Sequence, residues 1–269
     1  TGLISEYAYN GKSMLGEGGT LKPNFWRAPT DNDMGAGLQK KFKVWKNPQM
    51  NLKNIDVKKD KKANTVTIVT SFDMPEVQGQ MDITYLVFAN TGAVKVTEDF
   101  KATEGAKVSD MFRFGMLLQM PYSMEKSTYY GRGPIENYSD RKDCMRIAIY
   151  NDDADNQYFP YIRPQESGTK SDIRWWKQTD ATGLGLQVKS CAPFYASALH
   201  FDTEELDDGD EKEQRHSFDL KKSKFTNLFL DAAHMGVGGE NSWGAWPLEK
   251  YRVHYGNKTF NFVLIPQTK

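Results

Sequence analysis

Three glutamates on glycine- or proline-bounded loops are the residues of this chain best suited to acid–base chemistry. They are Glu136, Glu166 and Glu240. Hydrolysis of a glycosidic bond needs two carboxyl groups across the bond, about 5–5.5 Å apart when the anomeric configuration is retained and farther apart when it is inverted. The sequence gives no sign that any two of these side chains face each other. We therefore assign no catalytic residue within the chain.

The four histidines and one glycine-rich run give weak support to other chemistries. His200, His216, His234 and His254 fall on separate segments, without the His-x-x-x-His or Cys-x-x-Cys spacing that a zinc site requires. The run Gly236-Val-Gly-Gly239 follows a strand-like segment, but no helix start or lysine follows it to meet a phosphate. No Gly-x-Ser-x-Gly sequence marks a nucleophilic serine. We predict no metal and no cofactor in this chain.

Residues 234–247 carry the side chains with the clearest potential for ligand contact. A strand-like run at 228–230 precedes this stretch, three glycines follow His234, and Trp243 and Trp246 then lie close together on a loop that ends at Pro247. Such a tryptophan either fills the core or presents a flat face to a ligand such as a sugar ring. The residues alone leave both interpretations open.

Two further loops, 23–35 and 128–141, combine charged and amide side chains. Such groups can hold a loop together through Asx turns and ion pairs, or they can contact the hydroxyl groups of a sugar. In the second loop, ion pairing within the fold is the favoured interpretation because irregular backbone at a sheet end needs polar partners. The candidates are Arg27, Asp31 and Asn32 in the first loop, and Arg132 and Glu136 in the second.

The composition points away from charged polymers as partners. The 35 Lys and Arg residues balance 35 Asp and Glu residues, which makes nucleic acid and anionic membranes poor candidates. Apolar runs such as 260–265 are too short to cross a membrane. Aromatic residues make up 13% of the chain, which suits β-sheet cores and sugar contacts. Cys144 and Cys191 could be paired or reduced. We predict a soluble protein, cytoplasmic or periplasmic.

The elements that must position these loops are mostly β-strands. Alternation of apolar and polar residues predicts a large antiparallel all-β fold in one domain, 1–269, with a short helix at 39–45. Residues 3–21 are typical of a hairpin. Strands are predicted at 54–59, 65–72, 79–88, 93–100, 112–119, 184–189, 194–201, 227–230, 250–254 and 259–265.

Four ordered motifs resemble those of the C-terminal domain of glycoside hydrolase family 2 β-galactosidases, also called the small chain or domain 5. The resemblance runs from roughly Gly16 to Pro266 and implies a galactose mutarotase-like super-sandwich at the end of a multidomain enzyme. The motifs are Phe25-Trp-Arg-Ala-Pro-Thr-Asp-Asn-Asp33, Gly131-Arg-Gly-Pro-Ile-Glu-Asn-Tyr-Ser-Asp-Arg141, Pro164-Gln-Glu-Ser-Gly168 and Met235-Gly-Val-Gly-Gly-Glu-Asn-Ser-Trp243.

The resemblance implies a division of labour in the enzyme. Two glutamates of a TIM barrel perform the retaining cleavage of a β-galactoside, and such a barrel needs about 250 residues that this chain cannot also hold. The chain would be inactive alone, with the barrel as its partner, and oligomerisation of the parent enzyme stays open. Trp243 would reach the barrel's sugar site, and Glu240 stands where Asp is commoner. Substrate contact or loop structure remains open for Arg27, Asp31, Asn32, Arg132, Glu136, Glu166, His234, Glu240 and Asn241.

Two alternatives belong to other functional classes. An independent aldose epimerase would need a histidine acid and a carboxylate base that converge on one face of the sheet. His234 or His200 with Glu166 could supply them. A free carbohydrate-binding module would need neither.

Overall fold

The computed structural model describes residues 1–211, 213, 215–238, 241 and 244–268. Its strands are β1 Ala8–Tyr9, β2 Lys12–Ser13, β3 Leu21–Asn24, β4 Asn51–Asp60, β5 Thr65–Met74, β6 Gly79–Phe88, β7 Val94–Ala102, β8 Arg113–Pro121, β9 Lys126–Gly133, β10 Arg146–Asp153, β11 Lys170–Thr179, β12 Gly185–Leu199, β13 Phe225–His234 and β14 Lys258–Gln267. The α-helices are α1 Asp31–Gly35, α2 Leu38–Lys41 and α3 Thr203–Leu206. The 3₁₀ turns are η1 Lys43–Trp45, η2 Pro75–Val77, η3 Ser217–Asp219 and η4 Glu249–Tyr251.

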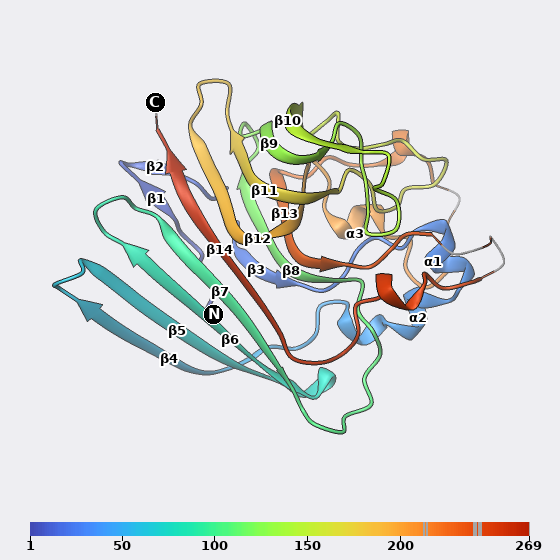
Figure 1. Cartoon of the computed structure of the whole chain (residues 1–269), viewed down its shortest axis with the longest axis horizontal. Coiled ribbons are helices and arrows are strands. Elements are labelled where there is room, and N and C mark those ends of the chain that lie inside the picture. Colours follow the sequence, from blue (N-terminus) through green and yellow to red (C-terminus); the bar gives the residue numbers. More distant parts are fainter. Residues whose placement is uncertain (212, 214, 239–240, 242–243, 269) are drawn as a thin grey trace.

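Among the described residues, twelve strands form one large antiparallel sheet, and β1 and β2 form a separate hairpin (Figure 1). The strand order is β10-β9-β11-β12-β14-β7-β6-β5-β4, and a branch through β13, β8 and β3 leaves the sheet at β12. This arrangement confirms the predicted all-β class and the large antiparallel sheet. The short helices α1 and α2 lie together at one end of the molecule, on the right in Figure 1.

Strand β12 joins the two branches of the sheet. Its first residues, 185–189, pair with β14, and its last residues, 195–199, pair with β13. The predicted strands at 184–189 and 194–201 are therefore one strand, and the prediction of two was wrong. Pro193 cannot donate a backbone hydrogen bond, but it lies where β12 changes partner, so extended backbone costs no ladder bond there.

Other boundaries also differ from the prediction. Strands β9, β10 and β11 were missed, and the first part of the predicted loop 128–141, as far as Gly133, belongs to β9. The predicted strand at 250–254 is instead η4 followed by a single bridge between Val253 and Met111. Arg252 and His254 point to Asp110, with contacts of 2.8 and 3.0 Å, so their side chains favour this irregular path.

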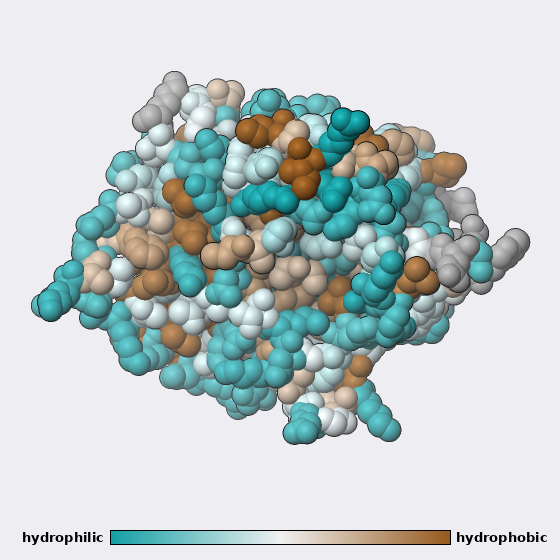
Figure 2. Space-filling view, viewed as in Figure 1, coloured by the Kyte–Doolittle hydropathy of each residue, from teal (hydrophilic) through white to brown (hydrophobic). Residues whose placement is uncertain are grey.

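The core is rich in aromatic rings. The period-2 alternation of β6 buries Met81, Ile83 and Tyr85 on one face. Trp45 of η1 lies in the same core, 5.3 Å from Phe25 and 5.7 Å from Phe100 between ring centroids. At the surface, Figure 2 shows hydrophobic residues in several separate groups on the face in view. Cys144 and Cys191 are exposed and free. In the described part of the chain, no helix has the length and apolarity needed to span a membrane.

Candidate functional site

Arg27 of the first motif holds the fourth motif against the first. Its side chain is fully buried and forms a two-point ion pair with Asp33, with Nε to Oδ2 at 3.0 Å and Nη2 to Oδ1 at 2.8 Å. Nη1 and Nη2 also donate to the carbonyl oxygens of Met235 and Gly236, at 2.7 and 2.9 Å respectively. A planar guanidinium with four of its five N–H groups engaged in this way fixes both loops in one geometry.

The start of α1 connects the first motif to the third and fourth. Thr30 and Asp33 form a reciprocal capping box, which holds the helix start in place. Asn32 then donates from Nδ2 to the carbonyl oxygen of Val237 at 3.0 Å. The carboxylate of Asp31 accepts from Arg163 Nε at 3.1 Å and from Gln165 Nε2 at 2.9 Å. Both candidate side chains therefore contact neighbouring loops.

Glu136 connects the second motif to the third. One carboxylate oxygen accepts from Arg141 and from the hydroxyl of Tyr161, and the other accepts from the backbone N–H of Gly168 at 2.8 Å. Its side chain is only 10% exposed. With three donors on one carboxylate, Glu136 is well suited to ordering these loops.

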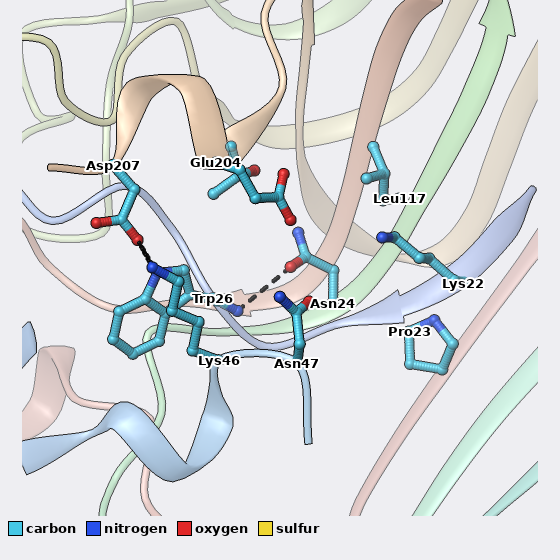
Figure 3. Close-up of a pocket in the computed structure, with 10 residues that line it drawn as sticks. Lys22, Pro23, Asn24, Trp26, Lys46, Asn47, Leu117, Glu204 and Asp207 are labelled. Atoms are coloured by element: carbon cyan, nitrogen blue, oxygen red, sulfur yellow. Dashed lines mark hydrogen bonds and ion pairs between the residues drawn. The ribbon is translucent and has the colours of Figure 1, made fainter. Parts of the chain in front are cut away.

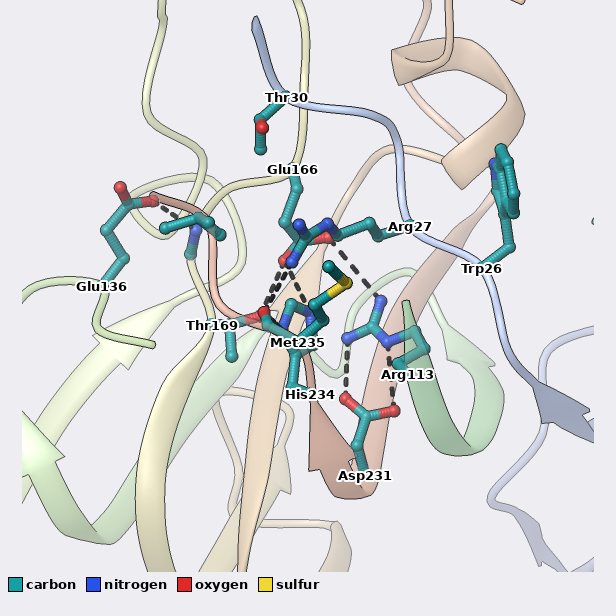
Figure 4. A network of polar contacts seen from close by, with 12 residues as sticks. Trp26, Arg27, Thr30, Arg113, Glu136, Glu166, Thr169, Asp231, His234 and Met235 are labelled. Atoms are coloured by element: carbon teal, nitrogen blue, oxygen red, sulfur yellow. Dashed lines mark hydrogen bonds and ion pairs between the residues drawn. The ribbon is translucent and has the colours of Figure 1, made fainter. Parts of the chain in front are cut away.

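Glu166 lies in a buried polar network beneath the loops (Figure 4). Thr169 Oγ1 donates to its Oε1 at 2.7 Å, and Arg113 Nη1 lies 3.6 Å from its Oε2. His234 Nε2 is 3.8 Å from Oε1, while His234 Nδ1 lies 3.0 Å from the carbonyl oxygen of Met235. Burial, with the nearby positive charges of Arg113 and Arg27, lowers the pKa of His234 well below its usual value. The imidazole is therefore neutral, with its proton on Nδ1 facing the carbonyl oxygen.

A surface pocket of about 190 Å³ opens above this network. Every motif contributes to its wall, because the folded loops bring all four to the same end of the molecule. The lining residues are Thr30, Asp31, Asn32, Tyr138, Arg141, Tyr161, Gln165, Glu166 and Val237.

These four motifs also decide the family. The model of the β-galactosidase small chain matches residues 1–264, which includes all of them. The chain belongs to the β-galactosidase small-chain family.

Curated relatives and solved structures give the extent of this likeness. The β-galactosidase of Priestia megaterium is 31% identical over 267 residues, which cover 98% of this chain and 25% of the relative. That of Lactobacillus delbrueckii subsp. bulgaricus is 35% identical over 222 residues, or 82% of this chain and 21% of the relative. The chain thus spans about a quarter of the length of these relatives. The GH36 α-galactosidase AgaA from Geobacillus stearothermophilus has a TM-score of 0.42 and 9% identity, covering 81% of this chain and 28% of that structure.

Apart from those at 240–243, the predicted site residues of this chain fall into two groups. Those that meet around the pocket and the network below it are Arg27, Asp31, Asn32, Glu136, Glu166 and His234. Arg132 lies apart from them. It pairs with Asp172 of β11 and donates to the carbonyl oxygen of Met145 at 2.8 Å, so its contacts stabilise the end of β9.

The structure describes the predicted tryptophan loop only in part. Glu240 and Trp243 lie outside the described residues, whereas Asn241 is described and exposed. Trp246 packs edge-on against Phe42, with ring centroids 5.5 Å apart, and the guanidinium carbon of Arg252 lies 4.5 Å above its ring. Of the two interpretations that the residues left open, Trp246 therefore takes the first and packs against its own fold.

Asp140 holds the backbone of the fourth motif but was not among the predicted site residues. Its carboxylate accepts from the backbone N–H groups of Val237 at 3.1 Å and Gly238 at 2.8 Å. A Cβ atom on Gly236 would lie 2.5 Å from Asp140 Oδ2, so this approach requires glycine. Its position in the second motif was the sign in the sequence that Asp140 has a role at the site. Its partners could not be inferred, because they lie almost a hundred residues away.

Arg113 was also missed. It is 1% exposed and pairs at two points with Asp231, with Nε to Oδ1 at 3.1 Å and Nη2 to Oδ2 at 2.7 Å. Burial raises the pKa of Asp231 to about 7, against the opposing attraction of Arg113. A lone arginine in the apolar run Met111–Phe114 was the available signal, because a charge in such a strand needs a buried partner.

Trp26, in the first motif, has a structural role. Its Nε1 donates to Asp207 Oδ2 at 2.8 Å, and Lys46 Nζ lies 2.7 Å from the same oxygen (Figure 3). The adjoining cavity measures about 20 Å³, which is room for roughly one water molecule. This cavity is too small for a sugar.

His200 does not approach Glu166 in the way that the epimerase alternative would require. Its Nδ1 is 2.8 Å from Asp155 Oδ1, and its ring stacks on Tyr122 with centroids 3.8 Å apart. Of the two nominated histidines, His234 is the one beside Glu166. Over the described ranges, no group of three or more His, Cys, Asp or Glu side chains could hold a metal ion.

Proposed function

We propose that this chain supports and completes the sugar site of a retaining β-galactosidase whose two catalytic glutamates lie in a barrel outside it. The observation that carries the proposal is the meeting of all four motifs around one pocket, with the 235–238 segment held by Arg27, Asn32 and Asp140. That segment leads directly to Trp243, whose proposed role is an aromatic contact to the sugar. Family membership and the quarter-length match to β-galactosidases support the same assignment.

Glu136 and Glu166 are the two glutamates that the structure describes near the pocket. Their contacts support the proposal that the isolated chain is inactive. Glu136 already accepts from Arg141, Tyr161 and Gly168, and Glu166 lies among Thr169, Arg113 and His234. A nucleophile or general acid needs access to the reacting atoms. The partners of the chain would be the barrel of the parent enzyme and a β-galactoside.

The test compares the isolated chain with the longer parent enzyme on an aryl β-galactoside. The parent should hydrolyse it, with the β-anomer as the first product seen by proton NMR, and the isolated chain should not. Turnover by the isolated chain that survives purification and disappears in Glu166→Gln or Glu136→Gln would refute the proposal. An α-anomer as first product would refute retention alone.

The 3.8 Å contact between His234 and Glu166 favours one second candidate, an aldose epimerase. The neutral imidazole and its bond to Met235 oppose it, because the acid would need a proton that it can deliver to the sugar. Polarimetry of freshly dissolved α-galactose distinguishes the two functions. The proposed function predicts that the isolated chain leaves the uncatalysed rate of mutarotation unchanged.

A further inference from the structure

A second pocket, of about 220 Å³, is lined in part by the second motif and has no part in the function proposed above. It is formed by the loop after β9, the end of β10, the loop that follows β10 and the start of β11. Glu136 lines this pocket while its carboxylate faces Tyr161 and Arg141 of the first pocket. The residues that matter for binding are Ile135, Asn151, Asp152, Asn156, Phe159 and Lys170.

Two large apolar side chains are exposed at this pocket. Ile135 is 61% exposed and Phe159 is 54% exposed. The Phe159 ring packs against Tyr161 with centroids 4.6 Å apart, and its backbone N–H donates to Ser167 Oγ at 3.4 Å. An aromatic ring already held by such contacts loses little conformational entropy when it covers a ligand. Its exposed face suits the apolar C–H face of a ring.

The polar side chains of the pocket are fixed by contacts to the protein. Thr128 Oγ1 donates to Asn151 Oδ1 at 2.8 Å, which leaves the Asn151 amide N–H groups for a ligand. Asn156 Nδ2 donates to Asp153 Oδ2 at 2.9 Å, which leaves its own Oδ1 as an acceptor. The pocket thus offers both donors and acceptors in set directions, as a ligand with several hydroxyl groups requires.

The charges of the pocket are balanced. Lys170 is 1% exposed, donates from Nζ to the carbonyl oxygen of Gly168 at 2.7 Å, and lies 3.6 Å from Asp152 Oδ2. Glu136 has Arg141 as its counter-charge. A neutral ligand therefore suits the pocket better than an anion or a cation. Its volume is below the roughly 300–1,000 Å³ of sites for drug-sized molecules, which limits the ligand to about one ring.

We infer that this pocket binds one neutral pyranose ring, with Phe159 against its apolar face and Asn151, Asp152 and Asn156 at its hydroxyl groups. The choice of sugars as the ligand class rests on the proposed function. The sugar would be bound and released unchanged, so no residue of this pocket is assigned a catalytic role.

Ligand-observed saturation-transfer NMR on the 269-residue chain tests this site. The probes are methyl β-D-galactopyranoside and methyl β-D-glucopyranoside, and sorbitol serves as a polyol without a ring face. Saturable binding of at least one glycoside, and none of sorbitol, is expected. The variant Phe159→Ala should weaken binding about tenfold, the effect of losing one aromatic contact. Asp152→Asn should also weaken it, because one carboxylate acceptor is lost.

The matched control is Phe218→Ala, since Phe218 is 85% exposed and lines neither pocket. This variant should bind the glycosides as the unmodified chain does, and all variants should keep the same circular dichroism spectrum. The inference is overturned if neither glycoside binds up to about 100 mM, or if Phe159→Ala binds normally. Failure here leaves the proposed function intact, because that function is tested by hydrolysis in the parent enzyme.

Discussion

Arg27 and Asp33 form a fully buried two-point ion pair only six residues apart in the chain, and the same guanidinium also binds two carbonyl oxygens of the fourth motif. One side chain therefore stabilises the first motif internally and attaches it to the last. Because these bonds are buried, losing either partner leaves an uncompensated charge in a low-dielectric region.

Arg27→Lys should lower the free energy of unfolding by about 1–3 kcal/mol, the cost of leaving buried hydrogen-bond acceptors unsatisfied. Lysine keeps the charge but cannot reach Asp33 and both carbonyl oxygens from one planar group. Chemical denaturation of the chain measures the change. Arg146→Lys is the control, since Arg146 is exposed on β10 and should be close to neutral. Equal stability of the two variants would contradict this role of Arg27.

The contribution of Asp231 to the stability of the chain should fall as the pH rises from about 4 to about 7, opposed by that of His234, whose lowered pKa favours folding at the higher pH. Burial raises the pKa of Asp231 to about 7 in the folded chain, above its ordinary value of 3.8, so folding favours the protonated form. The stabilisation is complete below the unfolded-state pKa and is lost as the pH rises through the folded-state pKa. The contribution of Glu98 to stability changes with pH in the same direction as that of Asp231. Burial, and then the nearby charge of Asp231, raise the pKa of Glu98 well above its ordinary value.

Urea denaturation at a series of pH values measures this dependence. Glu98→Gln should flatten it, because both carboxylate oxygens of Glu98 are buried without a hydrogen-bond partner in the described chain and the amide carries no charge. Glu104→Gln, at an exposed position, should leave the profile unchanged. Stability that rises over this pH interval in the unmodified chain would show that other groups dominate.

Gly236→Ala should destabilise the chain by roughly 1–3 kcal/mol. The new methyl group would lie 2.5 Å from Asp140 Oδ2 and displace the carboxylate from the N–H groups of Val237 and Gly238. Thermal unfolding measures the loss. Gly35→Ala is the matched control, because a Cβ atom there meets nothing within 4 Å. The explanation fails if Asp140→Ala leaves the penalty of Gly236→Ala undiminished.

Trp243→Ala in the parent enzyme should weaken sugar binding by roughly 1–3 kcal/mol, with a higher KM or a loss of transfer to acceptor sugars. Trp246→Ala should instead lower the unfolding temperature, because Trp246 packs against Phe42 and Arg252 of its own fold. Steady-state kinetics and thermal unfolding of both variants separate the two effects. Unchanged kinetics of Trp243→Ala with substrate and acceptor would remove Trp243 from the sugar site.

Whether the sequence predicts a strand depends on which side chains that strand buries. Strand β6 was predicted with correct ends because Met81, Ile83 and Tyr85 alternate with more exposed residues. Strands β9 and β11 were missed because they bury polar groups: Ser127 Oγ donates to Gln178 Oε1 at 2.7 Å, and both side chains are almost fully enclosed. Hydropathy cannot reveal such positions, since their burial depends on a partner from another strand.

The sequence by itself determined the β class, the long antiparallel strands and, through four ordered motifs, the family. It also identified three of the nine residues that line the pocket, Asp31, Asn32 and Glu166. Only the tertiary structure decided their partners: Arg132 pairs with Asp172, whereas Arg27 reaches Met235 across 208 residues of chain. Alternation and turn chemistry are local properties that a sequence displays, but the partner of a buried charge depends on which loops the sheet brings together.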